Sequence, residues 1–184
     1  MHKVAVLVGS LRRDSINMKL AKALAGLGQS RFDFRFLALA DMPVYNEDLW
    51  QNPPPAVLKM KADIENADAV LFVTPEYNRS IPPVVKNAID WGSRPWGKNS
   101  WAGKAASVVG ASPGAVGTAV AQSHLRSILP TLDMNVLGQP EVYFVNKDGL
   151  IDGDHAITNE GTRQFLEGYL AKLDAFIARH KKAA

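Results

Sequence analysis

The chain has 184 residues, of which 47% are hydrophobic and 21% are charged, and its formal net charge is +3. This balance is typical of a globular protein and excludes the disordered and fibrous classes. The chain contains no cysteine, which excludes disulfides, thiolate metal sites, iron–sulfur clusters and a redox-active cysteine pair. Any redox chemistry must therefore come from a bound cofactor. The length predicts a single domain over residues 1–184.

The amino-terminal segment, residues 1–8, holds an apolar run that is too short for a signal peptide or a membrane span. We therefore expect a cytoplasmic protein that has no membrane partner. Part of the positive charge lies in residues 179–182, a segment typical of a solvated helix end. Because no nucleic-acid-binding motif accompanies the charge, we expect no nucleic acid partner. A mildly basic surface also suits anionic cofactors and substrates.

Five short apolar segments alternate with longer amphipathic segments along the chain. Most of the five lack the polar alternation of a half-exposed strand, so they predict strands buried on both faces. The predicted strands are residues 3–8, 32–39, 69–73, 105–109 and 142–145. Apolar residues at helical spacing mark three helices between the first four strands: Leu20, Leu24 and Leu27; Val57, Met60 and Ile64; Val84, Ala88 and Trp91.

Two further helices are predicted in the second half of the chain. One covers about residues 115–132, with Pro130 bending or ending it, and the last covers about residues 160–180. The alternation of strands and helices predicts an α/β fold with a doubly wound, five-stranded parallel sheet and helices on both faces. The expected strand order is 2-1-3-4-5. In such sheets ligands bind at the carboxyl ends of the strands where the winding reverses, which selects the loops after strands 1, 3 and 4.

The loop after the first strand, residues 9–17, is rich in groups that bind anions. It matches neither G-x-G-x-x-G nor G-x-x-x-x-G-K-[ST]. Side-chain donors come from Ser10, Ser15 and Asn17, while Arg12 adds charge and the next helix presents free N–H groups at its positive end. The structural alternative is that Ser15 only caps the helix and the arginine is solvated. Because a cap needs one oxygen and this loop supplies three, we predict a site for a phosphate monoester.

The loops after the third and fourth strands offer an aromatic ring and a glycine-rich backbone. In residues 74–83, prolines stiffen both ends and Tyr77 lies near the tip, where it has no strand or helix face to pack on. A flat ligand would give the ring a partner, and the alternative is a rigid surface turn with Tyr77 over its own loop. In residues 110–117, three glycines let the backbone approach a ligand closely, and the alternative is an ordinary helix start.

Three segments taken together resemble a known family. They are Gly9-Ser10-Leu11-Arg12-x-x-Ser15-x-Asn17, then Thr74-Pro75-Glu76-Tyr77-Asn78, then Lys86-Asn87-Ala88-Ile89-Asp90-Trp91. In this order and spacing they resemble the NADPH-dependent FMN reductases, a group that includes bacterial quinone, chromate and azo-dye reductases. The resemblance covers nearly the whole chain and implies a flavodoxin-like fold that binds FMN.

The resemblance also implies which residues contact the cofactor. The first loop would hold the FMN phosphate, the second would lie along the isoalloxazine ring, and the third, which matches the family pattern more loosely, would complete the flavin site. The implied cofactor-binding residues are Ser10, Arg12, Ser15 and Asn17 in the first loop, Pro75, Glu76, Tyr77 and Asn78 in the second, and Ser112, Gly114 and Gly117 in the third.

The implied activity is NAD(P)H-dependent reduction of quinones and similar small electrophiles, with chromate, azo and nitro compounds as further candidates. The four histidines are far apart, and no residue pattern suits nucleophilic catalysis, acid–base catalysis or metal binding. We therefore expect no catalytic side chain, with hydride transfer at flavin N5 and ping-pong kinetics. NADPH and NADH both remain open as co-substrates, although Arg13 and Arg79 could hold a 2′-phosphate.

Two other functions are compatible with this fold. A flavodoxin-type electron carrier would bind flavin without a substrate of its own, but such carriers tend to be acidic and have a Thr/Ser-rich phosphate loop without arginine. A receiver-type regulatory domain would need acidic residues after the first strand, where Gly9-Ser10 stands. Neither pattern is met by this sequence.

Three of the four tryptophans, Trp91, Trp96 and Trp101, are concentrated at the end of the third helix and in the loop beyond it. Tryptophan is enriched at protein interfaces, and a loop of this kind is usually polar. The alternative is that the rings pack on their own domain. Members of the resembled family are commonly dimers or tetramers with the helix after P-E-Y-N near the subunit contact. We therefore expect a homodimer or homotetramer in which the partner partly walls the flavin site.

Overall fold

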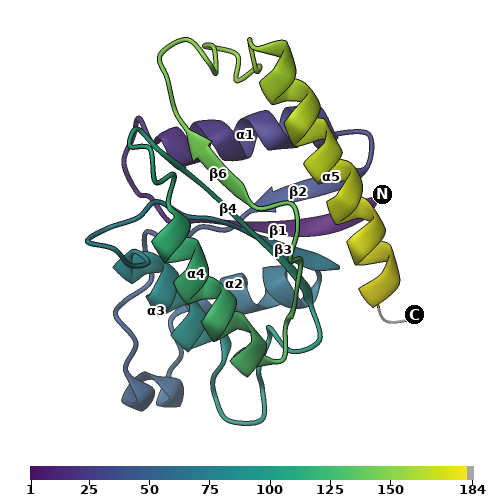
Figure 1. The fold of residues 1–184 in the computed structure, drawn as a ribbon. Helices are drawn as coiled ribbons and strands as arrows, with labels where there is room; N and C mark the ends of the chain where they lie inside the picture. Colours follow the sequence, from purple (N-terminus) through teal and green to yellow (C-terminus); the bar gives the residue numbers. More distant parts are fainter. Residues whose placement is uncertain (182–184) are drawn as a thin grey trace.

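The computed structural model describes residues 1–181 and has at its centre a parallel sheet with helices on both faces (Figure 1). The sheet order is β2-β1-β3-β4-β5, with β6 also paired to β4, and this confirms the predicted order. The strands are β1 (His2–Val8), β2 (Phe32–Phe36), β3 (Ala69–Val73), β4 (Ala105–Ser112), β5 (Asn135–Val136) and β6 (Val142–Val145). The helices are α1 (Ile16–Gly28), α2 (Pro55–Glu65), α3 (Pro83–Gly92), α4 (Ala119–Ile128) and α5 (Glu160–His180), with short 3-10 helices η1 (Glu47–Gln51) and η2 (Leu129–Leu132).

The fifth position of the sheet holds two short strands where the sequence predicted one. The first half of β4 pairs with β5 through residues 105–106, and its second half pairs with β6 through residues 109–112. β4 is therefore longer than predicted, because its extra residues provide the ladder for β6. A strand of two residues carries no periodicity, so β5 could not be detected in the sequence.

Two predicted boundaries also differ from the structure. The second strand ends at Phe36, and the apolar Leu37 and Leu39 beyond it are buried in the core beneath the helices. The fourth helix begins at Ala119, four residues later than predicted, because the segment before it forms a glycine-containing turn. Pro130 lies in η2, since a residue without an N–H cannot continue the α-helical hydrogen bonds.

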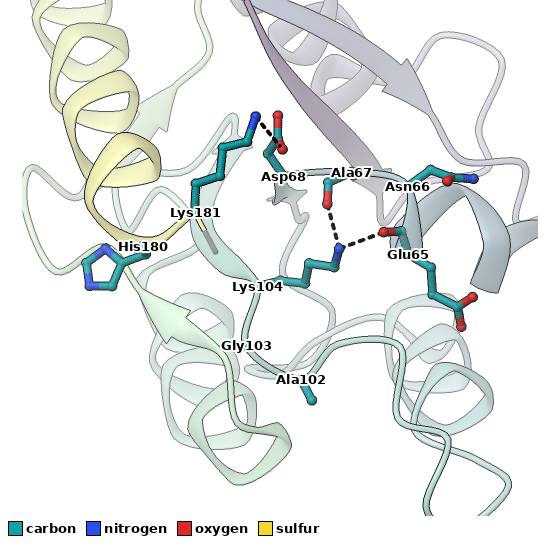
Figure 2. A pocket seen from close by; sticks show the side chains of 9 residues that line it. All are labelled: Glu65, Asn66, Ala67, Asp68, Ala102, Gly103, Lys104, His180 and Lys181. Atoms are coloured by element: carbon teal, nitrogen blue, oxygen red, sulfur yellow. Dashed lines mark hydrogen bonds and ion pairs between the residues drawn. The ribbon is translucent and has the colours of Figure 1, made fainter. Parts of the chain in front are cut away.

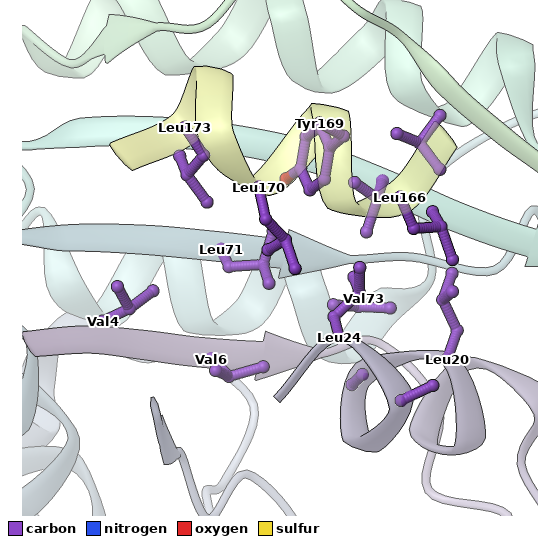
Figure 3. Packing of buried hydrophobic residues seen from close by; sticks show 14 of the residues in the cluster. Val4, Val6, Leu20, Leu24, Leu71, Val73, Leu166, Tyr169, Leu170 and Leu173 are labelled. Atoms are coloured by element: carbon purple, nitrogen blue, oxygen red, sulfur yellow. The ribbon is translucent and has the colours of Figure 1, made fainter. Parts of the chain in front are cut away.

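Successive residues of the inner strands point to opposite faces of the sheet and build two apolar layers. On one face, Val4 and Val6 of β1 pack with α1 and α5, as the labelled side chains in Figure 3 show. On the other face, Ala5 and Leu7 pack beneath α2, α3 and α4. Both faces of the sheet are therefore covered. Within residues 1–181 we find no helix with the length and apolar character needed to cross a membrane.

The tryptophan cluster differs from the prediction. Trp91 and Trp101 are 0% exposed. The indole N–H of Trp91 donates to the carbonyl of Pro43 at 2.8 Å, and that of Trp101 donates to the carbonyl of Ile89 at 3.1 Å. The prediction that these rings face a partner is therefore wrong for Trp91 and Trp101, because α3 and the following loop fold them into the monomer's own core. Trp96 is 88% exposed.

At the amino-terminal ends of the strands, an ion pair joins the residue before β3 to the residue after α5 (Figure 2). Asp68 lies 3.0 Å from the Lys181 ammonium and accepts the backbone N–H of Lys3 at 2.9 Å. Partial burial raises the pKa of the Asp68 carboxyl, but Lys3, Lys181 and the nearby His2 lower it by more, so the pKa lies below its usual value of 3.8. A lowered carboxyl pKa stabilises the fold above the unfolded-state pKa, and this contribution is lost as pH falls through the folded-state pKa.

We predict that Asp68→Asn lowers the free energy of unfolding at neutral pH by about 1 kcal/mol, because the amide keeps an oxygen for Lys3 but loses the charge that attracts Lys181. The difference between variant and wild type should shrink as pH is lowered from about 5 through the folded-state pKa. Urea unfolding at a series of pH values measures this. Asp154→Asn, in an exposed loop, is the matched control. A stability difference that does not change with pH would contradict the assignment.

Candidate functional site

A cleft of about 150 Å³ opens at the carboxyl ends of β1, β3 and β4. β1 and β3 are neighbours in the sheet, yet the chain leaves β1 for α1 on one face and β3 for α3 on the other (Figure 1). This is the point where the winding reverses and where ligands bind in folds of this kind. The residues that line the cleft are Ser10, Arg12, Ser15, Ile16, Asn17, Pro75, Glu76, Tyr77, Ala111, Ser112 and Pro113.

Most of the predicted cofactor-binding residues therefore line one cleft, although they come from the loops that follow three different strands. The structure brings together Ser10, Arg12, Ser15, Asn17, Pro75, Glu76, Tyr77 and Ser112. Asn78, Gly114 and Gly117 were also predicted to contact the cofactor, but they lie outside the lining of this cleft.

The loop after β1 is held close to the sheet so that its polar groups face the cleft. A Cβ on Gly9 would lie 2.6 Å from the Val85 side chain of α3, so glycine lets the loop pass close to this helix. Ser10 and Ser15 are buried, while Arg12 is exposed at the rim. Ser15 caps α1 by accepting the backbone N–H of Met18 at 3.2 Å, and its own O–H remains able to donate. The cap and the proposed donor role are therefore compatible.

Asn17 joins the first loop to β4. Its amide N–H donates to the carbonyl of Ala111 at 2.9 Å, and its amide oxygen accepts the N–H of Ala111 at 2.8 Å. The side chain is buried, so this two-way contact fixes the distance between α1 and the end of β4. Asn17 therefore shapes the cleft in addition to its predicted donor role, for which its second amide hydrogen remains.

The loop after β3 forms a tight hairpin. The backbone groups of Tyr77 and Ser80 bond to each other in both directions at 3.0 Å. The two residues at the tip, Asn78 and Arg79, have φ of 50° and 62°, as a two-residue hairpin turn of type I′ requires. Tyr77 is 43% exposed at the mouth of the cleft. Asn78 is not part of the cleft lining, since it lies at the tip of the turn.

Glu76 connects this hairpin to α4. One carboxylate oxygen accepts the backbone N–H groups of Val120 and Ala121 at 3.0 and 3.1 Å, and the other accepts from Arg79 at 3.0 Å. The Glu76 side chain is 10% exposed. It therefore caps the first turn of α4 from a different loop, a role that the sequence did not indicate.

The loop after β4 completes the rim of the cleft. Ser112 accepts the N–H of Gly114 at 3.1 Å, which turns the chain away from the strand. Gly117 has φ of 58°, and a Cβ there would lie 2.9 Å from the backbone of Tyr143. The need for glycine at position 117 is therefore explained by the positive φ and by packing against β6.

Several lining residues were missed because they carry no polar signal. Ile16 and Pro113 contribute apolar surface, and Ala111 contributes backbone groups that bind Asn17. Each lies next to a predicted residue. Their place in the loops after β1 and β4 was therefore the signal in the sequence that could have identified them. The contact of Ser80 with His124 of α4 was also missed, since these residues are far apart in the sequence.

The donors in the cleft fit the phosphate end of FMN. The buried Ser10 and Ser15, the exposed Arg12 and the first residues of α1 line the same cleft, and the partly exposed Tyr77 lines it as well. The enclosed volume is below the roughly 300 Å³ of a typical small-molecule site, so part of a flavin ring would lie on the open surface beside Tyr77.

Comparison with known proteins agrees with this geometry. The NADPH-dependent FMN reductase family matches residues 2–149. A 2-hydroxy-1,4-benzoquinone reductase of a Burkholderia species is 47% identical over 175 residues, which cover 95% of this chain and 96% of that protein. A quinone reductase of Pseudomonas putida is 43% identical over 178 residues, which cover 96% of this chain and 95% of that protein.

A solved structure is similar along nearly its whole length. FerB, described as a flavoenzyme NAD(P)H:(acceptor) oxidoreductase from Paracoccus denitrificans, superimposes with a TM-score of 0.96 at 45% identity, covering 98% of this chain and 100% of that one. The family match, the identities and the cleft at the winding reversal agree with one another. This chain belongs to the NADPH-dependent FMN reductase family.

Proposed function

We propose that this protein is an FMN-dependent NAD(P)H oxidoreductase that reduces quinones and similar small electrophiles. The observation that carries the proposal is the cleft, in which an anion-binding loop and an exposed tyrosine meet at the carboxyl ends of β1 and β3. The quinone class comes from the names of the Burkholderia and Pseudomonas relatives. Chromate, azo and nitro compounds stay predictions that rest on the family alone.

The chemistry that FMN supplies when bound is hydride transfer, and the protein's residues bind and orient the reactants. Ser10, Ser15 and Arg12 would hold the phosphate group at the positive end of α1. Tyr77 presents a ring face at the mouth of the cleft, where it orients flat molecules and excludes water. Backbone N–H groups that remain free in the loops after β3 and β4 would stabilise negative charge on a bound ring.

The electron-carrier alternative is disfavoured by the same cleft. Arg12 stands in the predicted phosphate loop, where carriers of the flavodoxin type use Thr and Ser without arginine. The receiver alternative lacks the acidic residues that it needs after β1, because Gly9 and Ser10 occupy those positions.

We expect that Arg12→Ala weakens FMN binding about tenfold to a hundredfold, because a charge-assisted hydrogen bond contributes about 1.5–3 kcal/mol. Arg12 is exposed, so the fold should not change. Titration of the flavin-free protein with FMN, followed by flavin fluorescence, measures the dissociation constant. Arg31→Ala, which removes an exposed arginine at the opposite edge of the sheet, should bind like the wild type. Equal affinities for Arg12→Ala and wild type would remove Arg12 from the site.

The proposed activity predicts that FMN-loaded protein loses its yellow colour rapidly on addition of NADPH or NADH and regains it on addition of a benzoquinone. Steady-state rates at several concentrations of both substrates should give the parallel double-reciprocal lines of ping-pong kinetics. Running NADPH and NADH side by side also determines the preferred co-substrate. FMN binding without rapid bleaching by either nicotinamide would support the carrier function instead.

We further propose that the protein is a homodimer or a homotetramer whose partner subunit covers an apolar groove beside the cleft. The groove has a volume of about 460 Å³ and lies between the loop after β2 and α3. Val44 in this groove is 85% exposed, and it is held in place because its neighbour Tyr45 donates its backbone N–H to Asn87 of α3 at 2.8 Å. Leu11, next to Arg12, lines the same groove, so the groove adjoins the phosphate loop.

We predict that Val44→Asp lowers the molecular mass in solution toward that of the monomer, 20.0 kDa, because a carboxylate would be buried at the subunit contact. Light scattering at micromolar concentration measures the mass. Leu58→Asp, which changes an exposed apolar residue on α2, is the matched control. A wild-type monomer that retains FMN would contradict the assembly proposal.

The cytoplasmic location and the single domain over residues 1–184 stay predictions.

A further inference from the structure

We propose that the first turns of α4 hold Tyr77 in place in the FMN site, with Glu76 and His124 as positioning residues. The proposal rests on the proposed function in one respect, since it takes the cleft at Tyr77 to be the flavin site. It changes the role of Glu76, which the sequence assigned to cofactor contact. It also gives a role to His124, a residue outside the cleft lining.

The first argument is the way in which the start of α4 is capped. Thr118 occupies the cap position with φ of 72° and makes no side-chain cap hydrogen bond. Its hydroxyl oxygen instead accepts from Gln122 at 3.0 Å. The N–H groups of Val120 and Ala121 bond to the Glu76 carboxylate. The cap of α4 therefore comes from the hairpin that carries Tyr77, and the two elements cannot separate without exposing unpaired N–H groups.

A second contact joins the same two elements one helical turn further along. The hydroxyl oxygen of Ser80 lies 3.0 Å from Nδ1 of His124. Glu76 directly precedes the Tyr77–Ser80 pair and Ser80 belongs to it, and residues 120–121 and 124 are one turn apart on α4. The hairpin is therefore attached to α4 on both sides of Tyr77, and its turn residues Asn78 and Arg79 are already restricted by their positive φ.

The two contacts differ in strength. Glu76 accepts two backbone N–H groups with a carboxylate that is 10% exposed, at the positive end of a helix. His124 is exposed, so water competes for its bond to Ser80. The Arg79 side chain is 69% exposed, so its ion pair with Glu76 contributes little. We therefore expect the cap to determine most of the effect on Tyr77, with the histidine adding a smaller part.

The charge of Glu76 gives a further reason to assign it a positioning role. A carboxylate in a cleft built for a phosphate would repel the ligand unless its charge were compensated. Both of its oxygens are occupied, one by the helix terminus and one by Arg79. The Glu76 carboxylate therefore acts on the cleft through the hairpin that it holds.

The test compares Glu76→Ala, which removes the cap, with Glu76→Gln, which keeps an oxygen for the two N–H groups. The flavin-free proteins are examined first by hydrogen exchange, and the amides of residues 77–80 and 119–121 should exchange at least tenfold faster in Glu76→Ala than in wild type. FMN titration by flavin fluorescence should then show about tenfold weaker binding for Glu76→Ala and at most about threefold weaker binding for Glu76→Gln. Glu167→Ala, an exposed change on α5, is the control and should match wild type in both measurements.

A double-mutant cycle with Tyr77→Ala tests whether Glu76 acts through the tyrosine. If it does, Glu76→Ala should weaken FMN binding by no more than about twofold in the Tyr77→Ala background, since the ring that it positions is absent. For the second contact, His124→Ala should weaken binding by about twofold to threefold, and His124→Asn should restore it because the amide can still bond to Ser80.

Three results would overturn the proposal. They are unchanged exchange in Glu76→Ala, binding by Glu76→Gln that is as weak as that of Glu76→Ala, and full additivity in the cycle with Tyr77→Ala. If Glu76→Ala does not fold, the comparison of Glu76→Gln with wild type and the two His124 variants still decides the outcome. Failure of the wild type to bind FMN would instead reject the proposed function, and the exchange measurements on flavin-free protein would remain valid.

Discussion

Burial of both faces of the parallel sheet is the constraint on which the rest of this structure depends. α1 and α5 cover one face, and α2, α3 and α4 cover the other, so the inner strands β1, β3 and β4 are almost entirely buried. Along these three strands, polar groups and a ligand can therefore meet at the strand ends. At the carboxyl end, the chain leaves the adjacent strands β1 and β3 on opposite faces, which opens the space that the loops then line.

Side-chain hydrogen bonds attach the loops around this space to elements of the core. Asn17 attaches the first loop to β4, and Glu76 attaches the second loop to α4. Each contact uses backbone groups at an end of a strand or helix, where they have no partner within their own element. The same hydrogen bonds therefore complete the fold and preorganise the cleft. Preorganisation reduces the entropy that would otherwise be lost when a ligand binds.

The tryptophans illustrate how a composition argument can point to the wrong environment. Trp91 and Trp101 lie in a segment that the sequence treats as surface, and their clustering is typical of an interface. In the structure both rings are enclosed by the monomer and their N–H groups are bonded to the carbonyls of Pro43 and Ile89. The apolar surface that remains exposed near the cleft includes Val44, which lies in a loop where no strand or helix periodicity marks it.

The sequence by itself determined the order of strands and helices, the edge of the sheet that carries the site, and the family. These follow from local patterns, since apolar segments, helical spacing and the motifs at residues 9–17 and 74–78 are each readable within a short window. The tertiary structure alone decided the split of the fifth strand, the enclosure of Trp91 and Trp101, and the roles of Asn17 and Glu76. Those features depend on partners far away in the chain: Asn17 bonds to Ala111, and Glu76 bonds to Val120. A single sequence specifies which atoms can form hydrogen bonds, but the distance between them is set only when the sheet brings its loops together.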